Sequence, residues 1–349
     1  MRILEAIKIT FKASKRNSNF ELMRITSMLL IIIGHIFSWG GITENSTVYL
    51  QKWIYVIYAI MIVHVNSFVL LTGFFQSQSK KFSYKKVFKL LFYVWFYNNL
   101  ITIMGMRLGW FEVLKKDFIN TLIPFKYESH WFIYVFVFLY CLTPYLNKLI
   151  NNISQKKYRE LLYILFIFCS IMPSLFVDNF NYFYRGFSII NFIFMYFIGG
   201  YIRKYFDIIK NKKIAYLIPI MIIPMIINYI LYRTNLFEYK IFISYNNPFV
   251  IISSVAYFLI FSLVRLKSKI INFFSRHVIE IYIISEMPRF RSIIYHSFGL
   301  SLPIYTSRRI IIYAIIIDII IFISGTIIAY CRQLIFNIIG SFFNKKNQI

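Results

Sequence analysis

The chain has 349 residues, of which 59% are hydrophobic and 21% are aromatic, and its formal net charge is +26. Soluble domains are about 45–50% apolar, so this composition, with a mean hydropathy of +0.64, excludes an ordinary soluble domain and predicts an integral membrane protein. The basic residues lie in short clusters between apolar runs, which is typical of cytoplasmic membrane loops that also contact anionic lipids. Nucleic acid is therefore not an expected partner.

A basic segment, residues 1–19, comes first, and its positive charge predicts a cytoplasmic N-terminus. Ten apolar stretches follow, each about long enough to cross a bilayer. They are expected at residues 20–39, 53–75, 87–106, 130–150, 160–177, 186–202, 214–232, 248–264, 277–296 and 310–331. The loops between them alternate between strongly basic and nearly balanced. The sequence thus predicts an all-α integral membrane protein with about ten transmembrane helices, both termini in the cytoplasm, and one domain spanning residues 1–349.

The first span carries two ionisable residues, Arg24 near its start and His35 near its far end. They are 11 residues apart, which in a helix is three turns plus about 20°, so both project from one face about 16 Å apart. Ionisable residues in a span usually face a bundle interior or a wet cavity. Taken singly, Arg24 could snorkel to the interface and His35 could bond a neighbouring helix. The shared face favours a functional site.

The second span and the loop after it contain the next candidates. His64 lies in mid-span without a partner on a matching face and is interpreted as structural. The loop is the most basic in the chain, with Lys80, Lys81, Lys85, Lys86 and Lys89. Such lysines bind phosphates as point charges, but they also serve as an orientation signal and contact lipid headgroups.

The fourth span opens with His130 and Trp131. Trp131 fits an interfacial aromatic belt, while His130 is expected at a depth close to that of His35 and is a candidate partner for it. These two residues are therefore candidates for binding an acceptor or supporting the site.

The ninth span contains IEIYIISEMPRFR, with Glu286, Pro288, Arg289 and Arg291. Glu286 and Arg289 are three residues apart and could pair on one helix face, and Pro288 is expected to weaken the helix there. Charges at membrane depth mark a candidate site, although an ion pair near the interface is the simpler interpretation.

One predicted outside loop, residues 297–309, departs from the charge pattern because it carries Arg308 and Arg309. Either these arginines meet an anion, or the predicted number of spans is wrong near the C-terminus.

Several motifs are missing from the sequence. It contains no Walker loop, no HExxH and no GxSxG, which disfavours ATP-driven transport and metalloprotease chemistry. The three cysteines, Cys141, Cys169 and Cys331, are isolated in apolar segments, so no metal site is expected. No acidic pair of the kind used by nucleotide-sugar glycosyltransferases lies on a loop.

These residues resemble the acyltransferase-3 family of polytopic bacterial membrane acyltransferases. The similar segments are RNSNFELMRITSMLLIIIGHIF, VNSFVLLTGFF, HWFIYVFVFLYCLTPYLN and IEIYIISEMPRFRS. The spacing of Arg24 and His35 is the family's hallmark, and members typically have about ten core spans. This chain departs in having Thr72-Gly73 where Ser-Gly is usual, and SEMP in the ninth span where a histidine often follows.

The resemblance implies transfer of an acyl group, usually acetyl, from cytosolic acyl-CoA to a hydroxyl of a cell-surface carbohydrate in the bacterial plasma membrane. The acceptor would be a capsule, exopolysaccharide, wall glycan or lipid-linked sugar, and acyl-CoA would be a substrate, with no bound cofactor. Arg24 and His35 would be the functional pair, with His35 acting as base or acyl carrier.

Supporting roles also follow from the resemblance. Lys85, Lys86 and Lys89 would contact the CoA phosphates. Glu286 is the candidate to replace the missing histidine of the ninth span. Apart from the resemblance, the thioester oxygen needs a partner for its developing charge, and Arg289 is a candidate for it. Two other functions suit a basic, aromatic membrane protein. A flippase or transporter of lipid-linked sugars would predict internal repeats, and a polysaccharide polymerase a long outside loop, and the sequence shows neither.

Overall fold

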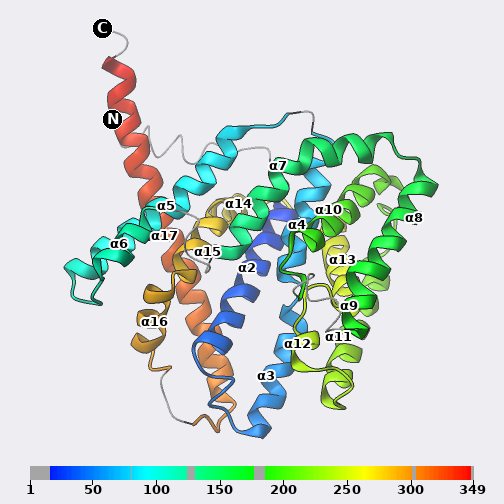
Figure 1. The fold of residues 1–349 in the computed structure, drawn as a ribbon, viewed down its shortest axis with the longest axis horizontal. Coiled ribbons are helices and arrows are strands. Elements are labelled where there is room, and N and C mark those ends of the chain that lie inside the picture. The colour runs from blue at the N-terminus through cyan, green and yellow to red at the C-terminus, as the bar shows by residue number, and fades with distance from the viewer. Residues whose placement is uncertain (1–15, 80, 124–129, 177–184, 301–303, 347–349) are drawn as a thin grey trace.

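A computed structural model describes residues 16–79, 81–123, 130–176, 185–300 and 304–346 (Figure 1). Most of the predicted basic segment, residues 1–15, therefore lies outside the described residues. The described chain is helical and contains no strand, which confirms the all-α prediction. The longer helices are α2 (Ser18–Trp39), α3 (Val48–Met61), α4 (His64–Gln76), α5 (Tyr84–Arg107), α7 (Trp131–Asn152), α8 (Gln155–Phe166), α10 (Ile189–Lys204), α11 (Ile214–Arg233), α13 (Pro248–Leu263), α15 (Val278–Glu286), α16 (Pro288–Ser297) and α17 (Arg309–Lys346). Shorter helices are α6 (Lys115–Thr121), α9 (Met172–Leu175), α12 (Tyr239–Phe242) and α14 (Lys269–Phe274), and a π-helix at Ile167–Ile171 joins α8 to α9.

Seven helical segments within the described residues are long and apolar enough to cross a bilayer, with α3 and α4 counted together. The predicted total of ten is not confirmed. Two predicted spans correspond to α10 and α13, which have 16 residues each; this is about 24 Å of helix, less than the roughly 30 Å of a hydrocarbon core. A third is divided into α15 and α16, because Pro288 starts a new helix. The cytoplasmic placement of both termini stays a prediction.

Helix α2 lies in the middle of the bundle, between its two halves (Figure 1). Met28, Ile32 and Phe37 pack into one apolar core with α3, α5, α15 and α17. Phe20 and Met23 pack into a second core with α4, α7, α10 and α13. The helix that carries Arg24 and His35 thus joins both halves of the protein.

Helices α4 and α10 approach each other closely through glycines. A Cβ atom on Gly73 would lie 2.3 Å from the carbonyl oxygen of Tyr196, and one on Gly199 would lie 2.3 Å from that of Leu70. Small residues allow such backbone contact in membrane bundles, where packing drives helix association. In the Thr72-Gly73 pair noted in the sequence, the glycine therefore serves helix packing.

Substituting Gly73 with alanine is expected to destabilise the bundle, because the clashing atom is backbone and cannot rotate away. Overpacking of this kind costs roughly 1–3 kcal/mol, which thermal unfolding in detergent would measure. Gly340→Ala is the matched control, since Gly340 has no neighbour within 4 Å and alanine favours helix. Equal unfolding temperatures for the two variants would contradict the close approach.

The last helix extends beyond its predicted end. Helix α17 has 38 residues and projects past the rest of the bundle (Figure 1). Arg332, one residue past the predicted end of the last span at 331, lies inside this helix, where its side chain is 10% exposed and paired with Glu280. Arg308 precedes the helix and lies over the rings of Tyr49 and Trp53, at 4.9 and 4.5 Å from their centroids. Cation–π contact with α3 thus accounts for this arginine without an anion.

Candidate active site

Two adjoining cavities run along α2. We call the larger, about 440 Å³, the vestibule and the other, about 240 Å³, the inner cavity. They share the wall residues Arg16, Arg24, Leu71, Thr72, Leu90, Phe136, Arg276 and Ile279. The inner cavity continues beyond this shared wall to His35, His64, Trp131 and Tyr245. Together, the adjoining cavities form a path along α2 that extends from the vestibule to His35.

The vestibule is lined by five basic residues, Arg16, Arg24, Lys86, Lys89 and Arg276. Two of them are held by aromatic rings, because Lys86 lies 5.8 Å from the ring centroid of Tyr140 and Lys89 lies 5.5 Å from that of Tyr93. Lys85, predicted to act with them, does not line this cavity. Burial lowers the pKa of Arg276, the neighbouring Arg16 lowers it further, and Glu21 opposes them. This excess of positive charge suits an anionic ligand.

Arg24 stands where the two cavities meet. Its Nη1 atom donates hydrogen bonds to both carboxylate oxygens of Glu21, at 2.9 and 3.0 Å. The same carboxylate lies 3.4 Å from Nη1 of Arg16. Glu21 is one turn before Arg24 on α2, so the spacing of three residues lets it position the guanidinium. The sequence analysis did not single out Glu21.

His35 contacts a carboxylate at the deep end of the path. Its Nδ1 atom lies 2.5 Å from Oε1 of Glu286, and the Glu286 side chain is only 6% exposed. Glu286 is the last residue of α15, just before Pro288 begins α16. A carboxylate at Nδ1 orients the ring and leaves Nε2 free to act, as in histidine–carboxylate pairs of hydrolases.

The predicted pair between Glu286 and Arg289 does not form. The arginine beside Glu286 is Arg291, whose Nη1 lies 3.4 Å from Oε2, while the Arg289 guanidinium lies 5.8 Å from the centroid of the Phe111 ring. A pair at a spacing of three residues needs a continuous helix, and Pro288, expected only to weaken the helix, starts a new one between the two residues. The same turn directs Arg291 over the ring of Trp39, at 4.2 Å.

The side chains of Trp131 and His130, the two candidates at the start of α7, have different surroundings. Trp131 lines the inner cavity and stacks on Tyr245 with ring centroids 6.1 Å apart. His130 is fully buried, and its Nε2 donates to the carbonyl oxygen of Ile283 at 3.1 Å. It therefore contacts α15 one turn before Glu286, the carboxylate that touches His35.

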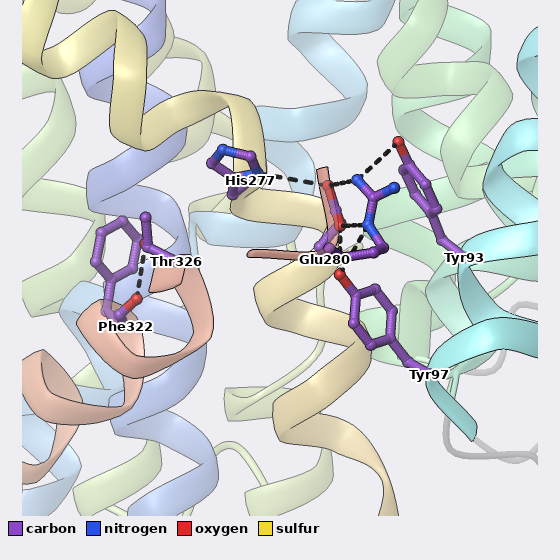
Figure 2. Close-up of polar contacts among 7 residues, drawn as sticks. Tyr93, Tyr97, His277, Glu280, Phe322 and Thr326 are labelled. Atoms are coloured by element: carbon purple, nitrogen blue, oxygen red, sulfur yellow. Dashed lines mark hydrogen bonds and ion pairs between the residues drawn. The ribbon is translucent and has the colours of Figure 1, made fainter. Parts of the chain in front are cut away.

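A buried polar network lies on the vestibule wall, where Glu280 contacts His277 and Tyr97 (Figure 2). Arg332 donates to both of its oxygens, from Nε at 2.8 Å and from Nη2 at 3.1 Å. The Tyr97 hydroxyl donates to Oε2 at 2.5 Å, and His277 Nδ1 lies 3.5 Å from Oε1. Arg332 also contacts the Tyr93 hydroxyl at 3.4 Å. The network ties α5, α15 and α17 together.

Some cavity residues were missed by sequence reasoning. Tyr245 is on a loop that contains no recognisable motif. The residues around Glu280 in the sequence do not indicate that it pairs with Arg332. His64 was interpreted as structural but lines the inner cavity with His35; the one available signal was an ionisable side chain in mid-span. Within the described residues, no group of three or more His, Cys, Asp or Glu could hold a metal ion.

Comparison with known proteins adds one finding. The acyltransferase-3 family model, described as an acyltransferase domain, matches residues 17–333. No curated protein and no solved structure gives a significant match. The matched range contains every residue discussed above as lining the two cavities except Arg16, which immediately precedes it.

Proposed function

The chain belongs to the acyltransferase-3 family of acyltransferase domains, and from this premise we propose that it moves an acetyl group from cytosolic acetyl-CoA to a hydroxyl of a cell-surface carbohydrate. The setting would be a bacterial plasma membrane, and the acceptor a capsule, exopolysaccharide or wall glycan, or the lipid-linked sugar that precedes it. The observation that carries the proposal is the path from a basic vestibule to the contact between His35 and Glu286.

The vestibule suits the donor. Coenzyme A carries several phosphate charges, and the cavity presents Lys86 and Lys89 beside three arginines. Arginine forks match phosphate oxygens and lysines act as point charges. Arg24, held by Glu21 at the junction, would bind the part of the donor that enters the inner cavity, whose largely apolar walls suit an extended pantetheine arm and its acyl end.

His35 would act as the general base. Its Nε2 would take the proton from the acceptor hydroxyl while that oxygen attacks the thioester carbonyl carbon. The new C–O bond forms as the carbonyl π electrons move to oxygen. When the intermediate collapses, the C–S bond breaks and the His35 proton passes to the leaving sulfur. The products are a glycan ester and free coenzyme A, and Glu286 would stabilise the imidazolium throughout.

The acceptor would approach the deep end of the path. Trp131 and Tyr245 present aromatic rings there, and such rings pack against the apolar faces of sugars while their polar edges bond hydroxyls. His130, which is buried against α15, would act by supporting Glu286.

Base-labile esters on the purified surface glycan test the function. Cells lacking this protein would be complemented with wild type, with His35→Ala or with Arg24→Ala, at equal membrane abundance. We expect esters with wild type alone. Esters unchanged in every strain would remove the acyltransferase, and loss of the whole glycan would favour a flippase or polymerase.

The donor assignment predicts a kinetic effect of the vestibule lysines. Changing both Lys86 and Lys89 to glutamine is expected to raise the KM for acetyl-CoA about tenfold, or about 1.4 kcal/mol, because charged hydrogen bonds to phosphate are lost. The kcat should change little, since neither lysine reaches His35. Initial rates at varied acetyl-CoA concentration measure both.

Lys85→Gln is the matched control for these lysines, because Lys85 is adjacent to Lys86 and does not line the vestibule. It should leave the KM near the wild-type value. The vestibule would not hold the donor if the double variant kept the wild-type KM, or if Lys85→Gln raised it equally.

A further inference from the structure

The path holds a second histidine in a setting that packing does not explain. Helix α3 ends at Met61 and α4 begins at His64, so the second predicted span is interrupted within the bundle. Val63 occupies the N-cap of α4, and no side chain there accepts a hydrogen bond from the helix. Uncapped N–H groups and the positive end of the helix dipole favour a partner with negative charge.

His64 is itself unsatisfied. The residue is 5% exposed, and its Nδ1 atom is buried without a hydrogen-bond partner among the described residues. The ring packs edge-on against Tyr245, with centroids 5.6 Å apart, and the residue lines the inner cavity with His35. An imidazole offers both a donor and an acceptor, so leaving it unpaired in a membrane interior costs free energy.

The polar residues next to His64 show that the fold can satisfy such groups at this place. Asn66 donates to the carbonyl oxygen of Tyr245 at 2.8 Å, and Ser67 donates to that of Val63 at 2.7 Å. Both belong to the same turn of α4. His64, by contrast, keeps its hydrogen-bonding capacity on the wall of the cavity, which is the pattern expected of a ligand-binding group.

The proposed reaction needs such a group. Negative charge develops on the thioester oxygen during attack, and a donor held ready for it is usually the largest single contribution to acyl-transfer catalysis. His35 is already engaged by Glu286, and Arg289, the candidate from sequence, lies against Phe111. An uncharged imidazole can polarise a carbonyl in this way.

Resting on the proposed function, we propose that His64 donates a hydrogen bond to the carbonyl oxygen of the acyl thioester, opposite the base His35. The two histidines come from α4 and α2, which pack against each other. One would hold the oxyanion while the other moves the proton, so each group has one task. The start of α4 would add its dipole to the same oxygen.

Kinetics and ligand binding together test this role. His64→Leu, which keeps an apolar side chain without a donor, is expected to lower kcat about 10²- to 10³-fold with little change in the KM for acetyl-CoA. His64→Gln retains an N–H donor and should recover at least about tenfold of that loss. Ser67→Ala, on the same turn but with its hydroxyl bonded to Val63, is the control and should keep the wild-type kcat.

Two inert donor analogues identify the atom that His64 binds. The first replaces the thioester sulfur with CH₂ and keeps the carbonyl, and the second is the S-ethyl thioether, which has none. Wild type should bind the ketone more tightly than the thioether, and His64→Leu should bind both alike. If His64→Leu does not fold, a smaller ketone preference in His64→Gln gives the same answer.

The outcomes separate the two proposals. The role of His64 alone is overturned if the wild-type enzyme is active and His64→Leu keeps a kcat within about threefold of the wild-type value. It is also overturned if His64→Leu still prefers the ketone to the thioether. A wild-type protein that neither transfers acetyl nor binds either analogue overturns the proposed function instead.

Discussion

Replacing His35 with alanine is expected to lower the rate of acetyl transfer about 10²- to 10⁴-fold, the usual contribution of a general base. The side chain is 25% exposed and lines the inner cavity with its Nδ1 against Glu286. Removing it should leave acetyl-CoA binding nearly intact, because the basic residues that would hold the phosphates lie in the vestibule. Single-turnover transfer of labelled acetyl by the purified protein in nanodiscs measures the rate directly.

Glu286→Gln should reduce the same rate by about tenfold or more, since a neutral amide neither stabilises the imidazolium nor selects the ring tautomer. His296→Ala is the control, because His296 is exposed on α16, outside both cavities. A His35→Ala enzyme that kept more than a tenth of the wild-type rate would show that the proton is moved elsewhere.

The same labelled donor distinguishes a base from an acyl carrier. Without an acceptor, a base at His35 leaves no label on the protein. Label that stays on wild type and is absent from His35→Ala would identify a covalent acyl-histidine, and the reaction would then proceed in two steps.

Breaking the pair between Glu280 and Arg332 is the second large expected effect. Both side chains are nearly buried, at 4% and 10% exposed, and removing one partner of a buried pair typically costs 3–5 kcal/mol because a charge is left uncompensated. Arg332→Met should therefore unfold at a much lower temperature in detergent. The loss should reach the vestibule, since Glu280 is on its wall.

A double variant, Glu280→Leu with Arg332→Met, should recover much of that loss, because no buried charge remains. Lys210→Met is the control, because it removes an exposed ion pair. Nζ of Lys210 lies 2.6 Å from Oδ1 of Asp207, and the two side chains are 51% and 88% exposed, respectively. Such surface pairs contribute little. Equal shifts for Arg332→Met and Lys210→Met would contradict a structural role for the network.

Some of the fold departed from prediction for reasons that are not local. Helices α10 and α13 are too short to cross a bilayer alone, yet both pack into the core beside α4. The length of an apolar stretch in the sequence does not show at which residue a helix begins or ends inside a bundle. The π-helix at Ile167–Ile171 and the extension of α17 past Arg332 likewise leave no signal in the hydropathy of the sequence.

The sequence by itself determined the membrane setting, the helical fold and the shared face of Arg24 and His35. Each of these follows from composition or from a period within one helix. Only the tertiary structure decided that Glu286 meets His35, that His64 lines the same cavity, and that Arg332 returns to Glu280. Such contacts join helices that are far apart in the chain. They form only when whole helices pack together, and the spacing of residues within one helix does not predict that packing.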